Sequence, residues 1–374
     1  MSYACKAKGL EKSFRLNTGQ AASCCKSYTE TFDKNLPELI QLWDRESKKM
    51  VTGVQVPSCE QCWRDERAGK PSLRHQLNAH PELENKIDIY LNNLCNHMCS
   101  YCSPKFSSMW EDSIRSEGVF DRISQSAKAN QSIDIELKGN PMQVESNLQQ
   151  IKDYVSTQPD NSVVVSLLGG EPLMQHASLH KILEFDQAKV KRTVIITNLT
   201  PPRTKFLEQI IKKIDRKKLL MHISLDTAPE YNHIARHGFD CTRFEENFRR
   251  LRDNQIEYTI LSTVSALAAF SLKEFAQWSQ THNITPTFMT LQNPSCLSIQ
   301  CLSVEAKQQI LQSVPGEFLT PELAWQLNTP EPARAIEFEL YSYTQQYFAR
   351  TGIKTSSMPE NMQIWWEKLS KKIG

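Results

Sequence analysis

The 374-residue chain carries 44 Lys and Arg against 42 Asp and Glu, and its formal charge of +2 excludes the strong overall positive charge of many nucleic-acid-binding proteins. Its 40% hydrophobic content can fill a core, and neither a membrane-spanning apolar run nor an apolar N-terminal leader is present, so we expect a globular cytoplasmic protein. Eleven cysteines, an odd number in a chain without a leader, argue against a disulfide framework.

Residues 1–85 show little apolar periodicity except for one helix pattern over residues 36–50. This irregular segment contains three groups of cysteines: Cys5, the pair Cys24 and Cys25, and the pair Cys59 and Cys62. A metal cluster bound by these thiolates would cross-link a segment that has few apolar contacts. A zinc ion held by four thiolates satisfies the same spacing and stays open as an alternative.

From Ile87 onward, short β-rich runs alternate with helical patterns. The six runs are residues 87–93, 163–170, 192–198, 219–226, 258–265 and 285–291. Helical patterns between them include residues 243–254 and residues 271–278, the latter opened by a Ser271/Glu274 capping box. Repeated βα units predict a parallel sheet, and six units fit a partial (β/α)6 barrel better than a closed barrel of eight. In such α/β folds the functional residues follow the carboxyl ends of the strands.

Two parts of the chain fall outside this alternation. The connection between the first two runs contains a possible extra strand, residues 132–138, and a helix pattern over residues 147–155. After about residue 303, helices are separated by prolines, with one start at Thr320 and Pro321. The predicted division is a cysteine-rich segment (1–85), a barrel (86–302) and a helical C-terminal extension (303–374).

The sharpest motif is CNHMCSYC, in which Cys95, Cys99 and Cys102 follow the first predicted strand. Three thiolates at this spacing can hold three irons of a [4Fe-4S] cluster and leave the fourth iron open. A zinc site or three structural thiols would also fit an isolated triplet. Cys241, Cys296 and Cys301 are scattered, and we do not expect them to bind a cluster.

This motif, with Tyr101 before the last cysteine, resembles the signature of the radical S-adenosylmethionine (SAM) superfamily. The resemblance extends to residues after the later predicted strands, namely Gly169, Gly170 and Glu171 of GGEP, Asn198, Ser224, Asp226 and Arg236. It implies that these residues and Tyr101 bind SAM, with GGEP at its amino group and Arg236 at its carboxylate. In this family the reduced cluster cleaves SAM, and the resulting 5′-deoxyadenosyl radical abstracts a hydrogen atom from the substrate.

The N-terminal cysteines resemble the auxiliary-cluster segment of twitch- or SPASM-type radical SAM proteins, here placed before the barrel. The similar elements are a hairpin over residues 13–25, which ends in Cys-Cys, and the Cys-x2-Cys-Trp that follows at residues 59–63. The resemblance implies a second iron-sulfur cluster ligated by Cys5, Cys24, Cys59 and Cys62, with Cys25 as the alternative to Cys24. Such a cluster relays electrons or positions the substrate.

The expected function is therefore radical modification of a peptide or small molecule, with an electron donor such as flavodoxin or ferredoxin. A nucleotide or nucleic-acid substrate is a less favoured alternative, and a non-catalytic, zinc-stabilised binding protein is the competing class. The aromatic residues of the C-terminal extension, among them Tyr341, Tyr343 and Tyr347, are expected to pack helices rather than to stack on a substrate.

Overall fold

The computed structural model describes residues 4–27, 29–31, 35–70, 72–79, 84–133, 141–291 and 293–373. The chain divides into two compact units. The first unit contains Met1–Asn92, Ile135–Ile196 and Phe206–Leu220, and the second contains Asn93–Asp134, Thr197–Lys205 and Met221–Gly374. No helix among the described residues is both long and apolar enough to cross a bilayer.

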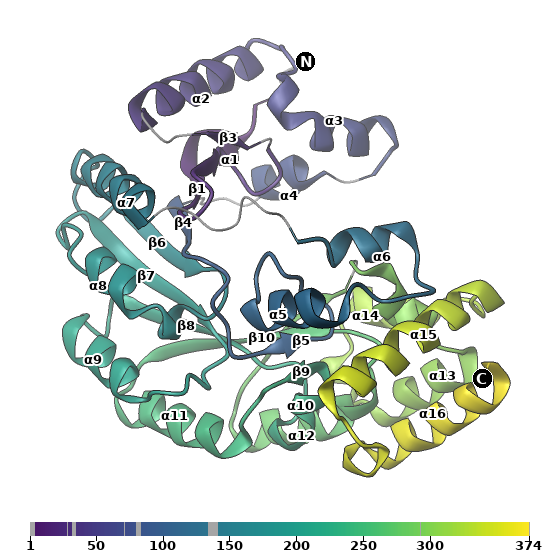
Figure 1. The fold of residues 1–374 in the computed structure, drawn as a ribbon. Helices are drawn as coiled ribbons and strands as arrows, with labels where there is room; N and C mark the ends of the chain where they lie inside the picture. Colours follow the sequence, from purple (N-terminus) through teal and green to yellow (C-terminus); the bar gives the residue numbers. More distant parts are fainter. Residues whose placement is uncertain are drawn as a thin grey trace. The chain divides into compact units, whose positions relative to one another are not determined.

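The first unit contains six neighbouring strands in the order β7-β6-β4-β1-β2-β3 (Figure 1). Their bounds are β1 (Glu11–Arg15), β2 (Gln20–Ala22), β3 (Glu30–Thr31), β4 (Asn85–Tyr90), β6 (Val163–Leu168) and β7 (Val190–Thr197). β1 and β2 form the predicted antiparallel hairpin, and β1 also pairs in parallel with β4. β6 is almost entirely buried, as its continuous apolar sequence predicts for a parallel strand covered on both faces.

Seven helices of the described residues belong to this unit: α1 (Lys6–Leu10), α2 (Leu36–Val51), α3 (Glu60–Arg67), α4 (Leu73–Ala79), α7 (Pro141–Ser156), α8 (His176–Ile182) and α9 (Lys205–Lys213). The helices predicted at residues 36–50 and 147–155 are confirmed as α2 and α7. The expectation of a single N-terminal helix is wrong, because α1, α3 and α4 also form. They are too short to show apolar periodicity, and α1 packs against both α2 and α4. Most of the possible strand at 132–138 lies outside the described residues.

The second unit contains strands in the order β8-β10-β11 and a separate antiparallel pair, β5 with β9. Their bounds are β5 (Met98–Cys99), β8 (Leu219–Ser224), β9 (Arg236–His237), β10 (Glu257–Val264) and β11 (Thr287–Thr290). The helices around them are α5 (Ser108–Glu117), α6 (Gln125–Asn130), α10 (Asn232–Ala235), α11 (Cys241–Asp253) and α12 (Leu272–Thr281). The capping box predicted for α12 is wrong, because the Ser271 hydroxyl donates to the carbonyl of Ala268 and does not cap the helix.

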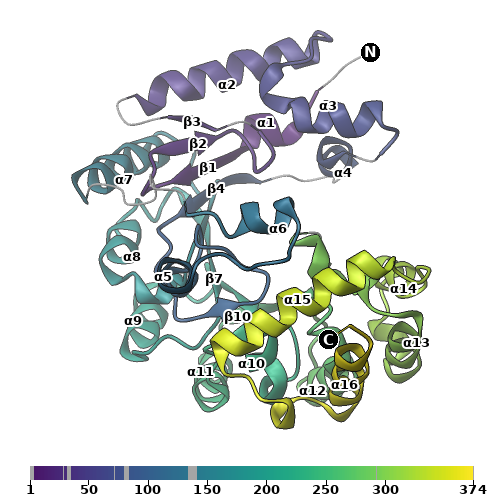
Figure 2. The ribbon, with the colours of Figure 1, turned by 45° about the vertical axis from the view of Figure 1, so that its right-hand side comes forward.

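The C-terminal extension is helical, as expected, and consists of α13 (Val304–Ser313), α14 (Pro321–Leu327), α15 (Arg334–Thr351) and α16 (Glu360–Ile373). α14 begins as predicted, with Pro321 in its first turn and the Thr320 hydroxyl accepting a hydrogen bond from the Leu323 amide. α15 and α16 pack against each other, which Figures 1 and 2 both show. The described short 3-10 helices that bear on the sites are η1 (Pro57–Cys59) and η3 (Pro172–Met174).

Each of the six predicted β-rich runs contains an observed strand: β4, β6, β7, β8, β10 and β11. Helices alternate with these mostly parallel strands, so the α/β fold with a partial (β/α)6 barrel is confirmed. The compact units do not follow the expected boundaries at residues 85 and 302. Pairing of β1 with β4 joins the N-terminal segment to barrel elements in one unit.

Candidate functional site

The triplet of cysteines lies on a loop of the second unit, where Cys99 is buried and Cys95 and Cys102 are half-buried. Backbone contacts close the loop around these thiols. The Cys95 amide donates to the Ser108 hydroxyl over 3.1 Å, and the Cys102 amide donates to the Cys99 carbonyl over 2.9 Å. The three cysteines therefore lie within eight consecutive residues of one loop, a spacing that suits three ligands of a single cluster.

Side chains from three helices, all buried except the half-buried Asn130, fix this loop through its carbonyl groups. The pairs are Tyr347 Oη with Met98, Trp110 Nε1 with Cys99 and Tyr343 Oη with Ser100, each over 2.8 Å, and Asn130 Nδ2 with Cys102 over 3.2 Å. Both tyrosines come from α15 and are fully buried, so their predicted packing role is correct. No sequence pattern predicted that their hydroxyls would donate hydrogen bonds to the cysteine loop, which is more than 240 residues away along the chain.

Asp226 and Arg236, both predicted SAM contacts, form a buried ion pair with each other. The Arg236 Nε and Nη2 groups donate to the two carboxylate oxygens of Asp226 over 2.9 and 3.0 Å. The same carboxylate accepts the Tyr101 hydroxyl over 2.6 Å and the Thr263 amide over 2.9 Å. Four donors thus satisfy Asp226, and three of the predicted residues join one network beside the triplet.

The network also affects the electrostatics of the thiols. Burial raises the pKa of Cys99 to about 12, and the positive charge of Arg236 opposes this rise. Burial raises the pKa of Cys102 as well. Because a cluster is ligated by thiolates, binding of a metal must release protons from these buried groups. Burial lowers the pKa of His97 well below its usual value, which keeps this loop residue neutral beside Thr200.

Asn198 and Gly238 shape the backbone next to Cys95. Asn198 Nδ2 donates to the side-chain oxygen of Asn96 over 2.9 Å. Gly238 has φ +96°, and a Cβ placed on it would lie 2.3 Å from the Asn96 carbonyl oxygen. Only glycine fits there, a requirement that the sequence analysis missed, although Gly238 follows the predicted SAM contact Arg236 by two residues. The remaining predicted residue of this unit, Ser224, is half-buried at the end of β8.

GGEP lies in the first unit, directly after β6. Gly169 has φ +83°, and a Cβ on it would lie 3.1 Å from the carbonyl oxygen of Asn92, so the glycine permits close approach of two backbone segments. Gly170 also has a positive φ, of 54°. Glu171 is buried, and its carboxylate caps η3 by accepting the Leu173 amide over 3.0 Å. Contact of these residues with SAM stays a prediction.

Four N-terminal cysteines of the first unit line one small cavity: Cys5, Cys24, Cys59 and Cys62. Cys25 is exposed and does not line it, and the charged groups nearest to its thiol include Glu11 and Asp88. The structure thus brings together the four thiols that the sequence predicts as ligands and favours Cys24 over Cys25. Burial raises the pKa of Cys24 to about 12.

Three basic residues, Lys8, Lys26 and Arg74, also line this cavity. Arg74 pairs with both carboxylate oxygens of Glu66 and donates to the Ala4 carbonyl over 3.2 Å, which anchors the residue before Cys5. Lys8 is fully buried and donates to the Ser58 hydroxyl, next to Cys59, over 2.8 Å. Positive charges at a cavity of four thiols suit the negative charge of a cysteine-ligated cluster.

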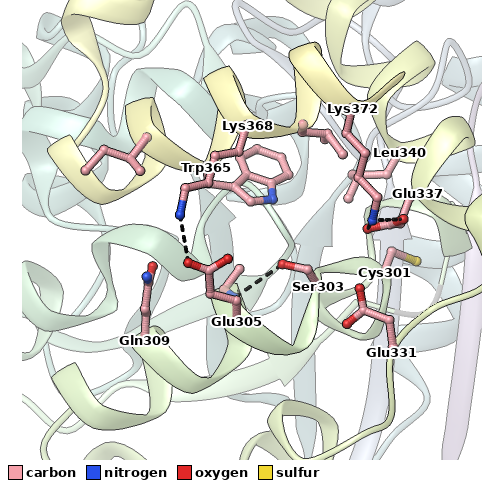
Figure 3. Close-up of a pocket in the computed structure, with 13 residues that line it drawn as sticks. Cys301, Ser303, Glu305, Gln309, Glu331, Glu337, Leu340, Trp365, Lys368 and Lys372 are labelled. Carbon is pink, nitrogen blue, oxygen red and sulfur yellow. Dashed lines mark hydrogen bonds and ion pairs between the residues drawn. The ribbon is translucent and has the colours of Figure 1, made fainter. Parts of the chain in front are cut away.

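Within the ranges that the structure describes, no three His, Cys, Asp or Glu side chains are grouped so as to hold a metal ion. Two other cavities, of about 200 and 680 Å³, lie among the C-terminal helices. The smaller one lies between α13, α15 and α16 and is bordered by the ion pairs Lys368–Glu305 and Lys372–Glu337 (Figure 3). Neither cavity is lined by a predicted ligand of a cluster or of SAM.

Parts of this chain are similar to solved structures and to one family model. The native anSMEcpe with bound AdoMet is similar at 16% identity with a TM-score of 0.42, over 61% of this chain and 59% of that chain. Streptococcus suis SuiB bound to S-adenosylmethionine is similar at 14% identity with a TM-score of 0.39, over 80% of this chain and 64% of that chain. The chain therefore spans about three fifths of the length of these proteins. No curated protein sequence matches the chain. The family model for the radical SAM superfamily matches residues 89–266. This segment, which includes Cys95, Cys99 and Cys102, is therefore identified as a radical SAM domain.

Proposed function

We propose that this protein is an enzyme that cleaves SAM reductively at a [4Fe-4S] cluster held by Cys95, Cys99 and Cys102. Such a cluster supplies one electron to SAM, which yields the 5′-deoxyadenosyl radical for hydrogen abstraction from a substrate. The observation that carries the proposal is the cysteine loop itself. Its three cysteines fall within eight consecutive residues, and buried donors fix the carbonyl groups of Met98, Cys99 and Ser100. Three protein ligands leave one iron for the amino and carboxylate groups of SAM.

The residues predicted to bind SAM have distinct parts in this proposal. Gly169 and Gly170 leave backbone groups accessible because they carry no side chain. Ser224 is half-buried at a strand end, where a hydroxyl can donate to a ligand. Asp226 and Arg236 are hydrogen-bonded to each other, so in this proposal their main role is to orient the cysteine loop and Tyr101.

We further propose that Cys5, Cys24, Cys59 and Cys62 ligate an auxiliary iron-sulfur cluster. Support comes from the shared cavity and from the three basic residues, Lys8, Lys26 and Arg74, that line it. Ligation by four cysteines leaves no open iron, which favours electron relay over direct binding of the substrate. A peptide or a small molecule is the substrate class that the resemblance to twitch- and SPASM-type proteins implies.

The test is anaerobic reconstitution with iron and sulfide, followed by addition of SAM and dithionite. We expect about eight irons per chain, as two four-iron clusters require. The Cys95/Cys99/Cys102→Ala variant should retain about four irons and produce no 5′-deoxyadenosine.

A variant with three other cysteines replaced, Cys241/Cys296/Cys301→Ala, is the matched control and should keep both the iron and SAM cleavage. Zinc in place of iron, or full iron loading without SAM cleavage, would overturn the proposed activity and favour a binding protein.

A further inference from the structure

Arg236 lies directly opposite a predicted cluster ligand. In the antiparallel pair of β5 and β9, Cys99 faces Arg236 and Met98 faces His237. Directly opposed residues of an antiparallel pair project to the same face. The close approach of Gly238 to the Asn96 carbonyl holds the two segments together just beyond this pair. The backbone therefore directs the guanidinium toward the Cys99 thiol.

The guanidinium is fixed by its other contacts. Its Nε and Nη2 groups are occupied by the Asp226 carboxylate, whose side chain is 0% exposed. Its plane lies near the Tyr101 ring, with 5.6 Å from the guanidinium carbon to the ring centroid. The third nitrogen, Nη1, donates to Cys99 Sγ over 3.8 Å. Because the Asp226 carboxylate binds one edge of the guanidinium at two points, the remaining N–H donors of Arg236 point toward the Cys99 sulfur.

We propose that Arg236 is a positioning residue that holds Cys99 and raises the reduction potential of the cluster, while Asp226 sets the size of this effect. Hydrogen bonds to ligand sulfurs and nearby charge are the main means by which a protein tunes an iron-sulfur cluster. A fixed positive charge stabilises the reduced form, which carries one more negative charge. The buried carboxylate of Asp226 partly cancels that positive charge. This role differs from the SAM contact that the family resemblance implies for Arg236, and it rests on the proposed ligation of a cluster by Cys99.

The test is a redox titration of the reconstituted protein followed by electron paramagnetic resonance. The signal that SAM perturbs reports the triplet cluster, since only that cluster has an open iron. Arg236→Gln should lower the ratio of reduced to oxidised cluster at a fixed solution potential by about tenfold, a shift of 59 mV for one electron. Asp226→Asn should raise the ratio, because the arginine charge then acts without its counterion. Arg236→Lys should lie between Arg236→Gln and wild type.

The reduction potential should shift in opposite directions in Arg236→Gln and Asp226→Asn if the effect is electrostatic. General damage to the loop would shift both potentials in the same direction. Arg243→Gln, the same change at a half-buried arginine on α11, should leave the potential unchanged. Full iron content with no shift in Arg236→Gln, or equal shifts in Arg236→Gln and Asp226→Asn, would refute the tuning role. If Arg236→Gln loses iron, the reduction potentials of Arg236→Lys and Asp226→Asn still test the tuning role. A wild-type protein that loads no iron on the triplet would instead overturn the proposed function, and this inference with it.

Discussion

The two cysteine sites differ in how the protein places the ligands. In the triplet, all three cysteines fall within eight consecutive residues, and hydrogen bonds from α5, α6 and α15 hold the carbonyl groups between them. In the N-terminal site the four cysteines come from separate places: before α1, after β2, and in and after η1. Cys5, Cys24 and the pair Cys59 and Cys62 are far apart from one another in the sequence.

From this comparison we propose that the protein shapes the triplet loop before a metal binds, whereas a metal would act as the cross-link of the N-terminal site. The small core around the latter consists of Met50, Val56, Cys59 and Trp63, with Cys5 packed against it. Two of its members are thus predicted ligands themselves. When ligands form part of the core, the free energy of metal binding becomes free energy of folding.

The largest effect is expected from breaking the N-terminal site. Cys24→Ala should remove about four of about eight irons and destabilise α1, α3 and α4, because the cavity loses one of its cross-links. Cys25→Ala should keep the iron, since Cys25 is exposed and does not line the cavity. Iron analysis with hydrogen exchange of the N-terminal peptides measures both. Loss of iron in Cys25→Ala alone would reverse the ligand assignment, and iron loss without faster exchange would show that the metal does not stabilise the segment.

A smaller effect is expected from straining the preformed triplet loop. Gly238→Ala introduces about 1–3 kcal/mol of backbone strain and a similar cost from overlap with the Asn96 carbonyl, which lies 2.3 Å from the added Cβ. Gly118→Ala is the matched control, because Gly118 also has a positive φ but nothing lies within 4 Å of its added Cβ. Chemical denaturation should show a larger loss of stability for Gly238→Ala. Equal losses would mean that the loop adapts and is not rigid.

The sequence predicted the parts of both sites that depend on local pattern. The strand positions follow from periodicity and the triplet from cysteine spacing, whereas the family resemblance implied the four N-terminal ligands. Cys5, Cys24, Cys59 and Cys62 line one cavity, and their ligation of a cluster stays a prediction. It could not predict α1, α3 and α4, because helices of five to eight residues form here through tertiary contacts.

The sequence could not predict the long-range polar contacts either. Asp226 and Arg236 are ten residues apart and each fits a SAM contact, yet the structure pairs them with each other. Nothing in the spacing of Tyr343 and Tyr347 indicates which carbonyl groups their hydroxyls reach. Such contacts depend on the arrangement of whole elements, which a single sequence does not encode in any local pattern.

The smallest effect is expected from removing one of these hydroxyls. Tyr347→Phe leaves the Met98 carbonyl, and the His237 amide that donates to the same oxygen, without their partner. An unsatisfied buried group costs about 1–3 kcal/mol. Tyr341→Phe is the control on the same helix, because that ring stacks on Trp366 and the stack survives the change. If the triplet loop is preformed, Tyr347→Phe should lower the free energy of unfolding in the metal-free protein as well as in the iron-loaded protein. A loss that appears only after reconstitution would mean that the metal, and not α15, sets the shape of the triplet, which would make the two cysteine sites alike.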